Sequence, residues 1–198
     1  EGVGRDDGKE AGEFSAVLYR TDRFEKMAGG TFWLSDAPDQ PGSITWGNAC
    51  TRICSWVRLK EKKSGRLLSV YNGHFDHVSA PSRLKAARLI GEMINEHGNT
   101  GHPTIVMGDF NTAPDSGPIS QLLNGSPVKF SNTLKPGPDG SRPGTYHGWK
   151  GKPRGKQIDY VLISPGIECL RSEVVRHHVN GRYLSDHFPV LAELQLKK

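Results

Sequence analysis

Short runs of apolar residues dominate the chain, and their length and period predict a protein built mainly from strands. Residues 13–20 and 52–60 are rich in β-branched, aromatic and aliphatic side chains. Residues 67–75 continue this pattern after a turn at Ser64 and Gly65. The second and third runs are therefore expected to pair as a hairpin, and strand alternation points Phe75 into the core.

One segment has the spacing of an amphipathic helix. Apolar residues recur every three or four positions across residues 81–97, with Pro81 in the first turn and Gly98 just beyond the end. The pattern predicts further strands at 104–107, 157–164 and 188–196, a weaker one at 172–178, and a short helix at 119–123. Strands with a few helices between them exclude a helical bundle or a coiled coil.

Residues 124–156 form a long stretch rich in Gly, Pro, Ser and Lys. Loops of this length in compact domains are usually functional or disordered. Near its end the stretch carries Tyr146, His147 and Trp149, followed by a basic cluster of Lys150, Lys152, Arg154 and Lys156. These would suit contacts with phosphate and with a base or sugar, and a solvated loop anchored by one Trp fits the composition equally well.

The composition is that of a folded globular protein, because 35% of the 198 residues are hydrophobic and 24% are charged. No repeat or linker divides the chain, so residues 1–198 are expected to form one domain. No apolar run reaches the ~18 residues that a membrane span needs, and residues 1–7 lack a signal-peptide pattern. The compartment stays open.

A formal net charge of +5 favours anionic partners, although an ordinary basic surface would account for it equally well. Three cysteines, Cys50, Cys54 and Cys169, cannot all pair within one chain. A zinc protein built on Cys50, Cys54 and the pair at 177–178 is an alternative. It is disfavoured because the two thiols fall in and beside a predicted strand, and adjacent histidines on a strand point to opposite faces.

The residue types that carry chemistry fall at predicted strand ends. Carboxylates and an Asn amide are oxygen ligands of the kind that Mg²⁺ prefers, and imidazoles move protons near neutral pH. This inventory predicts metal-assisted hydrolysis of a phosphate ester. The positions are His74, Asp109, Asn111, Asp159, Asp186 and His187.

Four motifs carry a resemblance to a known family: NGHFDH at 72–77, GDFNTAPDS at 108–116, QIDYVLIS at 157–164 and YLSDHFPV at 183–190. In order and spacing they resemble the endonuclease/exonuclease/phosphatase superfamily. A poorly characterised bacterial-type branch is most similar, because GVGRDDGKEAGEF at 2–14 and GTFWLSDAP at 30–38 also match. The resemblance implies an α+β fold, a four-layer αββα sandwich like that of deoxyribonuclease I, with the site at one rim of two packed sheets.

The resemblance also implies roles around the attacking water. Asp186 would be a metal ligand, and His187 would be the general base that activates the water. Asp159 would orient that imidazole through its other ring nitrogen. Asp109 would position or deprotonate the water and contact the metal.

Phosphate contacts follow from the same resemblance. Asn111 would donate to a phosphate oxygen, and Arg52 would bind phosphate through its guanidinium. His74 corresponds to a second catalytic histidine, a phosphate donor or general acid, and Glu13 to the carboxylate that orients it. Asp76 and His77 complete an H-x-D-H motif without an assigned role, except that Asp76 could accept a hydrogen bond behind the site.

Family members begin with an Asn-bearing strand and a helix that leads to a Gln-Glu pair, whose glutamate is the principal metal ligand. Both would lie upstream of Gly2. The resemblance therefore implies an N-terminally incomplete sandwich within residues 1–198, with Asp186 and Asp109 as the remaining metal ligands and reduced affinity for Mg²⁺.

The leading functional hypothesis is a phosphoesterase that depends on Mg²⁺ or Mn²⁺ and hydrolyses a phosphodiester or phosphomonoester by in-line attack of activated water. Its partner would be a nucleic acid or a phosphorylated small molecule or lipid, and the protein is expected to be a monomer. A nuclease and a small-molecule or lipid phosphodiesterase differ only in the surface around one shared site. The other alternative is a non-catalytic relative that uses the sandwich for binding.

Overall fold

The computed structural model describes residues 1–197, and its centre is a six-stranded sheet with the strand order β1-β2-β3-β4-β6-β5. Strands β3 and β4 pair in parallel, and every other neighbouring pair in this sheet is antiparallel. The strands are β1 Phe24–Trp33, β2 Ile53–Glu61, β3 Leu67–His74, β4 Thr104–Asp109, β5 Ser131–Asn132 and β6 Asp159–Ile163.

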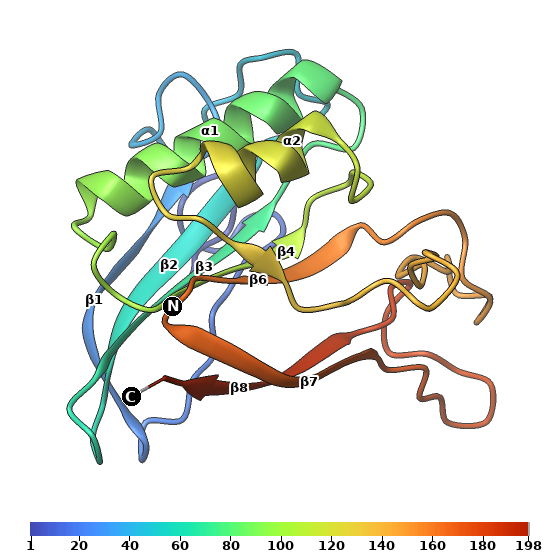
Figure 1. The fold of residues 1–198 in the computed structure, drawn as a ribbon. Helices are drawn as coiled ribbons and strands as arrows, with labels where there is room; N and C mark the ends of the chain where they lie inside the picture. The colour runs from blue at the N-terminus through green and yellow to red at the C-terminus, as the bar shows by residue number, and fades with distance from the viewer. Residues whose placement is uncertain (198) are drawn as a thin grey trace.

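A second sheet of two antiparallel strands, β7 Ile167–Val174 and β8 Val190–Leu196, lies on the opposite side of the central sheet from the helices (Figure 1). The helices are α1 Ala80–Glu96, α2 Gly117–Ser120 and the π-helical turn η1 Gln121–Gly125. The α+β sandwich is therefore confirmed. Of the four layers expected from the sequence, residues 1–197 form three, because no helix among them covers the outer face of β7 and β8.

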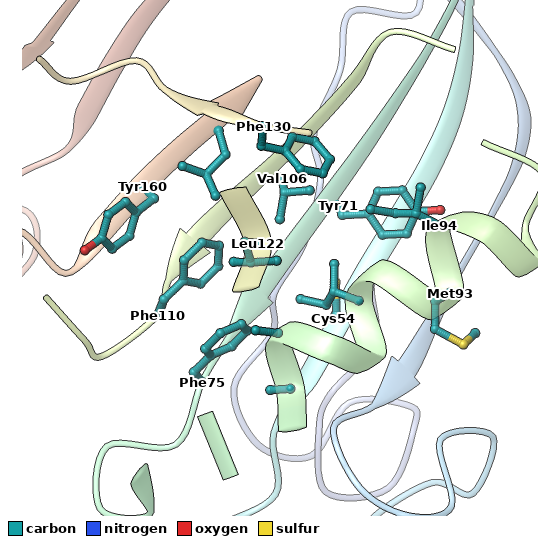
Figure 2. Packing of buried hydrophobic residues seen from close by; sticks show 14 of the residues in the cluster. Cys54, Tyr71, Phe75, Met93, Ile94, Val106, Phe110, Leu122, Phe130 and Tyr160 are labelled. Atoms are coloured by element: carbon teal, nitrogen blue, oxygen red, sulfur yellow. The ribbon is translucent and has the colours of Figure 1, made fainter. Parts of the chain in front are cut away.

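Helix α1 begins where the Ser79 side chain accepts a hydrogen bond from the Ser82 backbone N–H, and it ends before Gly98, whose φ is +66°. Its apolar face contributes Ala87, Ile90 and Ile94 to the core against the sheet, and Figure 2 shows Ile94 there. No helix in residues 1–197 combines the length and the apolar character that crossing a membrane requires.

The main core fills the space between the helices and the central sheet. Tyr71, Val106, Phe110 and Leu122 are among its fully buried side chains (Figure 2). Cys54 belongs to the same cluster, and burial raises the pKa of its thiol. A thiol held protonated in the core is a poor metal ligand, which weighs against the zinc alternative.

Several elements lie where the sequence predicts them. The 52–60 and 67–75 runs form the antiparallel pair β2 and β3, the helix at 81–97 is α1, and Phe75 is fully buried. The weak strand predicted at 172–178 is instead β7, which begins earlier and ends at Val174. Strand β1 was not predicted, because glycines and charged residues interrupt its apolar pattern.

The strand predicted at 13–20 is wrong. Ser15 and Val17 are buried as alternation requires, but the segment lacks a continuous neighbouring strand within residues 1–197. Its backbone bonds are isolated: Phe14 bridges to Gly4, and the Val17 N–H donates to the Glu1 carbonyl at 2.8 Å. A β-strand requires continuous backbone hydrogen bonds to a neighbouring strand, and an alternating side-chain pattern alone does not provide them.

His97, just after α1, couples stability to pH. Its ring stacks on Trp56 with centroids 3.9 Å apart, and its Nδ1 lies 3.0 Å from the Tyr71 hydroxyl. Burial, and then the nearby charge of Arg58, lowers the pKa of His97 from 6.5 to about 4. The unfolded chain therefore binds the proton first, so this contribution to stability is present above about pH 6.5 and is lost as the pH falls towards 4.

We therefore expect the free energy of unfolding to fall less between about pH 7 and pH 5 in His97→Gln than in the wild type, because glutamine does not titrate. Urea unfolding at several pH values measures this difference. His102→Gln is the matched control, since the His102 side chain makes no hydrogen bond within residues 1–197. An unchanged pH slope in His97→Gln would contradict the assignment.

Candidate active site

Three of the predicted site residues form one row across neighbouring strands. In the parallel pairing of β3 and β4, His74 lies opposite Asp109. In the antiparallel pairing of β4 and β6, Asp109 lies opposite Asp159. Residues opposite one another in neighbouring strands share a face of the sheet, so strand register brings together side chains that are far apart in the sequence.

The loop before β8 brings His187 to the same row. Residues 186–188 are held by residues 145–148 through backbone hydrogen bonds of 2.7 to 3.0 Å. The Thr145 hydroxyl in turn accepts a bond from the Asp159 backbone N–H at 3.1 Å. The end of the long loop predicted at 124–156 is therefore a support that joins His187 to the start of β6.

His187 and Asp159 form the shortest polar contact in the row. The Nδ1 of His187 lies 2.8 Å from Asp159 Oδ2, and its Nε2 lies 3.9 Å from Asp109 Oδ2. The hydrogen bond from Asp159 raises the pKa of His187 against the opposing effect of burial. The imidazole can therefore accept a proton at Nε2 while the carboxylate stabilises the resulting charge at Nδ1.

His74 approaches Asp109 from the other side. Its Nε2 lies 3.5 Å from Asp109 Oδ2, and its Nδ1 lies 3.5 Å from Glu13 Oε2. Glu13 also accepts a hydrogen bond from Arg5. Burial, and then the charges of Arg52 and Arg5, lowers the pKa of His74, which keeps this ring neutral near pH 7.

Asp109 is the carboxylate between the two histidines. Burial and the charge of Asp159 raise its pKa to about 6. The Asn111 backbone N–H donates to Asp109 Oδ1 at 2.9 Å, and the Asn111 side-chain amide donates to the Phe75 carbonyl at 3.0 Å and to Asp109 Oδ2 at 3.3 Å. Asn111 has a φ of +48°, a left-handed conformation that asparagine tolerates well.

One open cleft of about 690 Å³ collects these side chains. Every site residue that the sequence predicted lines it: Glu13, Arg52, His74, Asp109, Asn111, Asp159, Asp186 and His187. The cleft also contains Arg5 and His77, which received no role from the sequence, and Cys50 and Tyr146, which the sequence placed only in the zinc alternative and in the long loop. Arg5 could have been found from the sequence, because it lies within the segment at 2–14 that carries the family resemblance.

The donor set suits a divalent cation. Ligand atoms of Asp109, Asp159 and His187 all lie within 4.8 Å of one another, and Asp186 lines the same cleft outside this tight group. Carboxylate oxygens are the ligands that Mg²⁺ prefers. Burial and then the charge of Asp159 raise the pKa of Asp109, and a bound cation would stabilise its ionised form.

Comparison with known proteins shows the family of the chain. Residues 6–187 match the Endonuclease/Exonuclease/phosphatase family. The chain belongs to this family. No curated protein sequence matches the chain.

Solved structures of the family superpose closely. An endonuclease/exonuclease/phosphatase from Bacteroides vulgatus is 32% identical with a TM-score of 0.88, and the match covers 100% of this chain and 76% of that one. A mannosyl-6-phosphatase from Bacteroides thetaiotaomicron is 33% identical with a TM-score of 0.87, covering 99% and 76%. A functionally unknown conserved protein from Enterococcus faecalis is 31% identical with a TM-score of 0.85, covering 100% and 76%.

Replacing Asp109 by asparagine should stabilise the metal-free protein near neutral pH. Because the folded pKa is raised from 3.8 to about 6, the contribution of Asp109 is fully present below about pH 3.8 and is lost as the pH rises through 6. Asparagine carries no charge and still accepts the Asn111 N–H. In EDTA near pH 7.5 we expect the free energy of unfolding to rise by on the order of 1 to 2 kcal/mol.

Urea unfolding of both proteins across pH measures the difference, which should shrink between pH 6 and pH 4. Adding Mg²⁺ should then stabilise the wild type more than Asp109→Asn, because a ligand that binds the folded state adds to its stability. A variant less stable than the wild type in EDTA at pH 7.5 would contradict the charge argument.

Proposed function

We propose that the protein is a divalent-metal-dependent phosphoesterase that hydrolyses a phosphate ester by in-line attack of activated water. The observation that carries this proposal is the His187–Asp159 pair, which faces Asp109 in an open cleft that Arg52 also lines. General base, acidic cluster and phosphate-binding cation are the parts that this reaction requires. The single domain over residues 1–198 and the monomeric state stay predictions.

The acid–base roles follow from the hydrogen bonds. His187 takes a proton from water at Nε2, and Asp159 holds Nδ1–H and stabilises the imidazolium. Asp109 orients the water between the two histidines. His74, kept neutral and oriented by Glu13, contacts the phosphate as a hydrogen-bond donor.

Phosphate binding falls to Arg52 and Asn111. Arg52 is 4% exposed, so it is already desolvated and its orientation is fixed before substrate binds. Both N–H groups of the Asn111 amide already have acceptors, and the contact with Asp109 is the longer. A phosphate oxygen would therefore compete with Asp109 for that donor.

A bound Mg²⁺ or Mn²⁺ would be held by Asp109 and Asp186 and would supply charge stabilisation to the phosphate oxygens. The fit rests on the oxygen donors of the cleft, because Asp109 belongs to the tight group with Asp159 and His187, and Asp186 lines the same cleft.

A phosphorylated small molecule is favoured over a nucleic acid. No lysine among residues 1–197 lines the cleft, and Lys156 of the basic loop instead pairs with Asp115. A volume of about 690 Å³ falls within the size range of small-molecule sites. The 33% identical relative is a mannosyl-6-phosphatase, which supports a phosphomonoester on a small polar substrate.

Hydrolysis of bis-p-nitrophenyl phosphate, p-nitrophenyl phosphate and plasmid DNA tests this proposal. We expect turnover with Mg²⁺ or Mn²⁺, none in EDTA, and faster reaction with the small esters than with DNA. His187→Ala should lower the rate at least about 100-fold, because general-base catalysis contributes a factor of this order. His102→Ala should leave it unchanged.

Turnover that persists in EDTA, or that survives in His187→Ala, would contradict the proposed mechanism. DNA as the best substrate would support the nuclease alternative. No hydrolysis of any of the three by folded, metal-binding protein would favour a non-catalytic relative.

Asp159→Asn should lower kcat about 100-fold or more while KM changes little, because the amide cannot stabilise the charged imidazole but leaves the phosphate-binding groups in place. Steady-state kinetics and thermal unfolding measure this effect together. Exposed Asp139→Asn is the control. If KM rose about 100-fold while kcat stayed unchanged, Asp159 would instead be assigned to substrate binding.

A further inference from the structure

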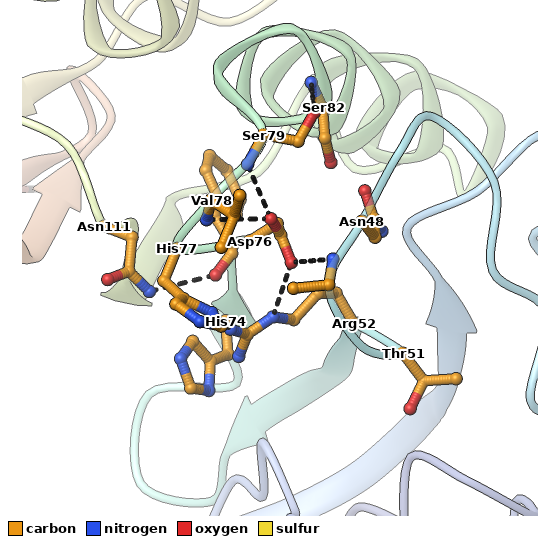
Figure 3. Close-up of polar contacts among 12 residues, drawn as sticks. Asn48, Thr51, Arg52, His74, Asp76, His77, Val78, Ser79, Ser82 and Asn111 are labelled. Carbon is orange, nitrogen blue, oxygen red and sulfur yellow. Dashed lines mark hydrogen bonds and ion pairs between the residues drawn. The ribbon is translucent and has the colours of Figure 1, made fainter.

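The H-x-D-H motif after β3 contains two residues that the proposed mechanism does not use, Asp76 and His77. Asp76 is 1% exposed, and both of its carboxylate oxygens are engaged (Figure 3). Oδ1 accepts the backbone N–H groups of Val78 at 2.9 Å and Ser79 at 2.7 Å. Oδ2 accepts the Ala49 N–H at 2.9 Å. Asp76 therefore joins the turn before α1 to the loop that leads into β2.

The same carboxylate fixes Arg52. Asp76 Oδ2 lies 3.6 Å from Arg52 Nε, and both side chains are almost fully buried (Figure 3). A buried ion pair that also receives backbone hydrogen bonds holds its partner in one orientation. Asp76 thus sets the direction of the Arg52 guanidinium.

Arg52 in turn determines which nitrogen of His77 carries a proton. Its Nη2 lies 2.8 Å from His77 Nδ1. A guanidinium can only donate, so Nδ1 must accept, and the ring is neutral with its hydrogen on Nε2. The Asp76–Arg52 pair therefore fixes one tautomer of His77.

His77 presents this donor to the cleft. It is exposed, and it lines the same cleft as Arg52 and His74. Cys50, Asp76 and His77 lie close enough to suggest a metal site. Such a site is disfavoured because both carboxylate oxygens of Asp76 already accept backbone hydrogen bonds and the Arg52 cation lies against Asp76 and His77. An anion is the ligand that these charges favour.

We propose that His77 is a specificity-determining residue whose neutral Nε2–H donates to a phosphate oxygen of the substrate beside Arg52, with Asp76 and Arg52 as positioning residues. The inference rests on the proposed phosphoesterase function.

Two substitutions separate the ring nitrogens. Glutamine places an N–H near the position of Nε2, whereas asparagine reaches only the position of Nδ1 and keeps a partner for Arg52. We expect His77→Asn to weaken binding of inorganic phosphate about 10-fold and to raise KM more than it lowers kcat, because one hydrogen bond to a charged group is lost. His77→Gln should stay within about 3-fold of the wild type.

Calorimetric titration with inorganic phosphate measures binding without turnover, and ¹H–¹⁵N NMR of the imidazoles reads the tautomer directly. His102→Asn is the matched control. Equal phosphate affinity in His77→Asn and the wild type, or a proton on Nδ1, would overturn the inference while leaving hydrolysis by the wild type intact. A wild type that neither binds phosphate nor hydrolyses esters would overturn the proposed function, and the substrate contact of His77 with it.

Discussion

The pairing of β3 with β4 is the constraint on which the site depends. Gly73 and Gly108 are register partners directly before His74 and Asp109. A Cβ on Gly108 would lie 2.0 Å from the Gly73 carbonyl oxygen, and Gly108 has a φ of +132°. Only glycine accepts both conditions, so any side chain at this position would separate the strands and move His74 away from Asp109.

Aromatic packing beneath the cleft holds the row in place. Since side chains alternate along a strand, the residues that follow His74, Asp109 and Asp159 point the other way, into the core. Phe75 stacks on Phe110 at 4.5 Å between centroids, and Phe110 on Tyr160 at 5.4 Å. The same polar–aromatic pair recurs four times, as His74-Phe75, Asp109-Phe110, Asp159-Tyr160 and His187-Phe188, and each aromatic side chain is at most 1% exposed.

This repetition explains how much could be predicted from the sequence. Each motif combines a chemical group with the side chain that anchors it, so the predicted site residues are recognisable locally and all line one cleft. Helix α1 and the β2–β3 hairpin follow from periodicity and turn residues. Strand β1 was missed because its identity comes from its pairing with β2 and not from its own pattern. Contacts such as Arg5 with Glu13 join side chains across a loop and leave no periodic signal.

The two histidines that face Asp109 differ in the carboxylate that contacts their other ring nitrogen. This difference separates the roles that we propose for them. His187 has Asp159 to itself at 2.8 Å, and its pKa is raised. The partner of His74, Glu13, lies at 3.5 Å and is shared with Arg5, while the pKa of His74 is lowered. A carboxylate already neutralised by an arginine gives little support to a second positive charge. In the proposed reaction, His187 is therefore the group that takes a proton from water, and His74 would serve as a neutral hydrogen-bonding group on the opposite side of the same carboxylate.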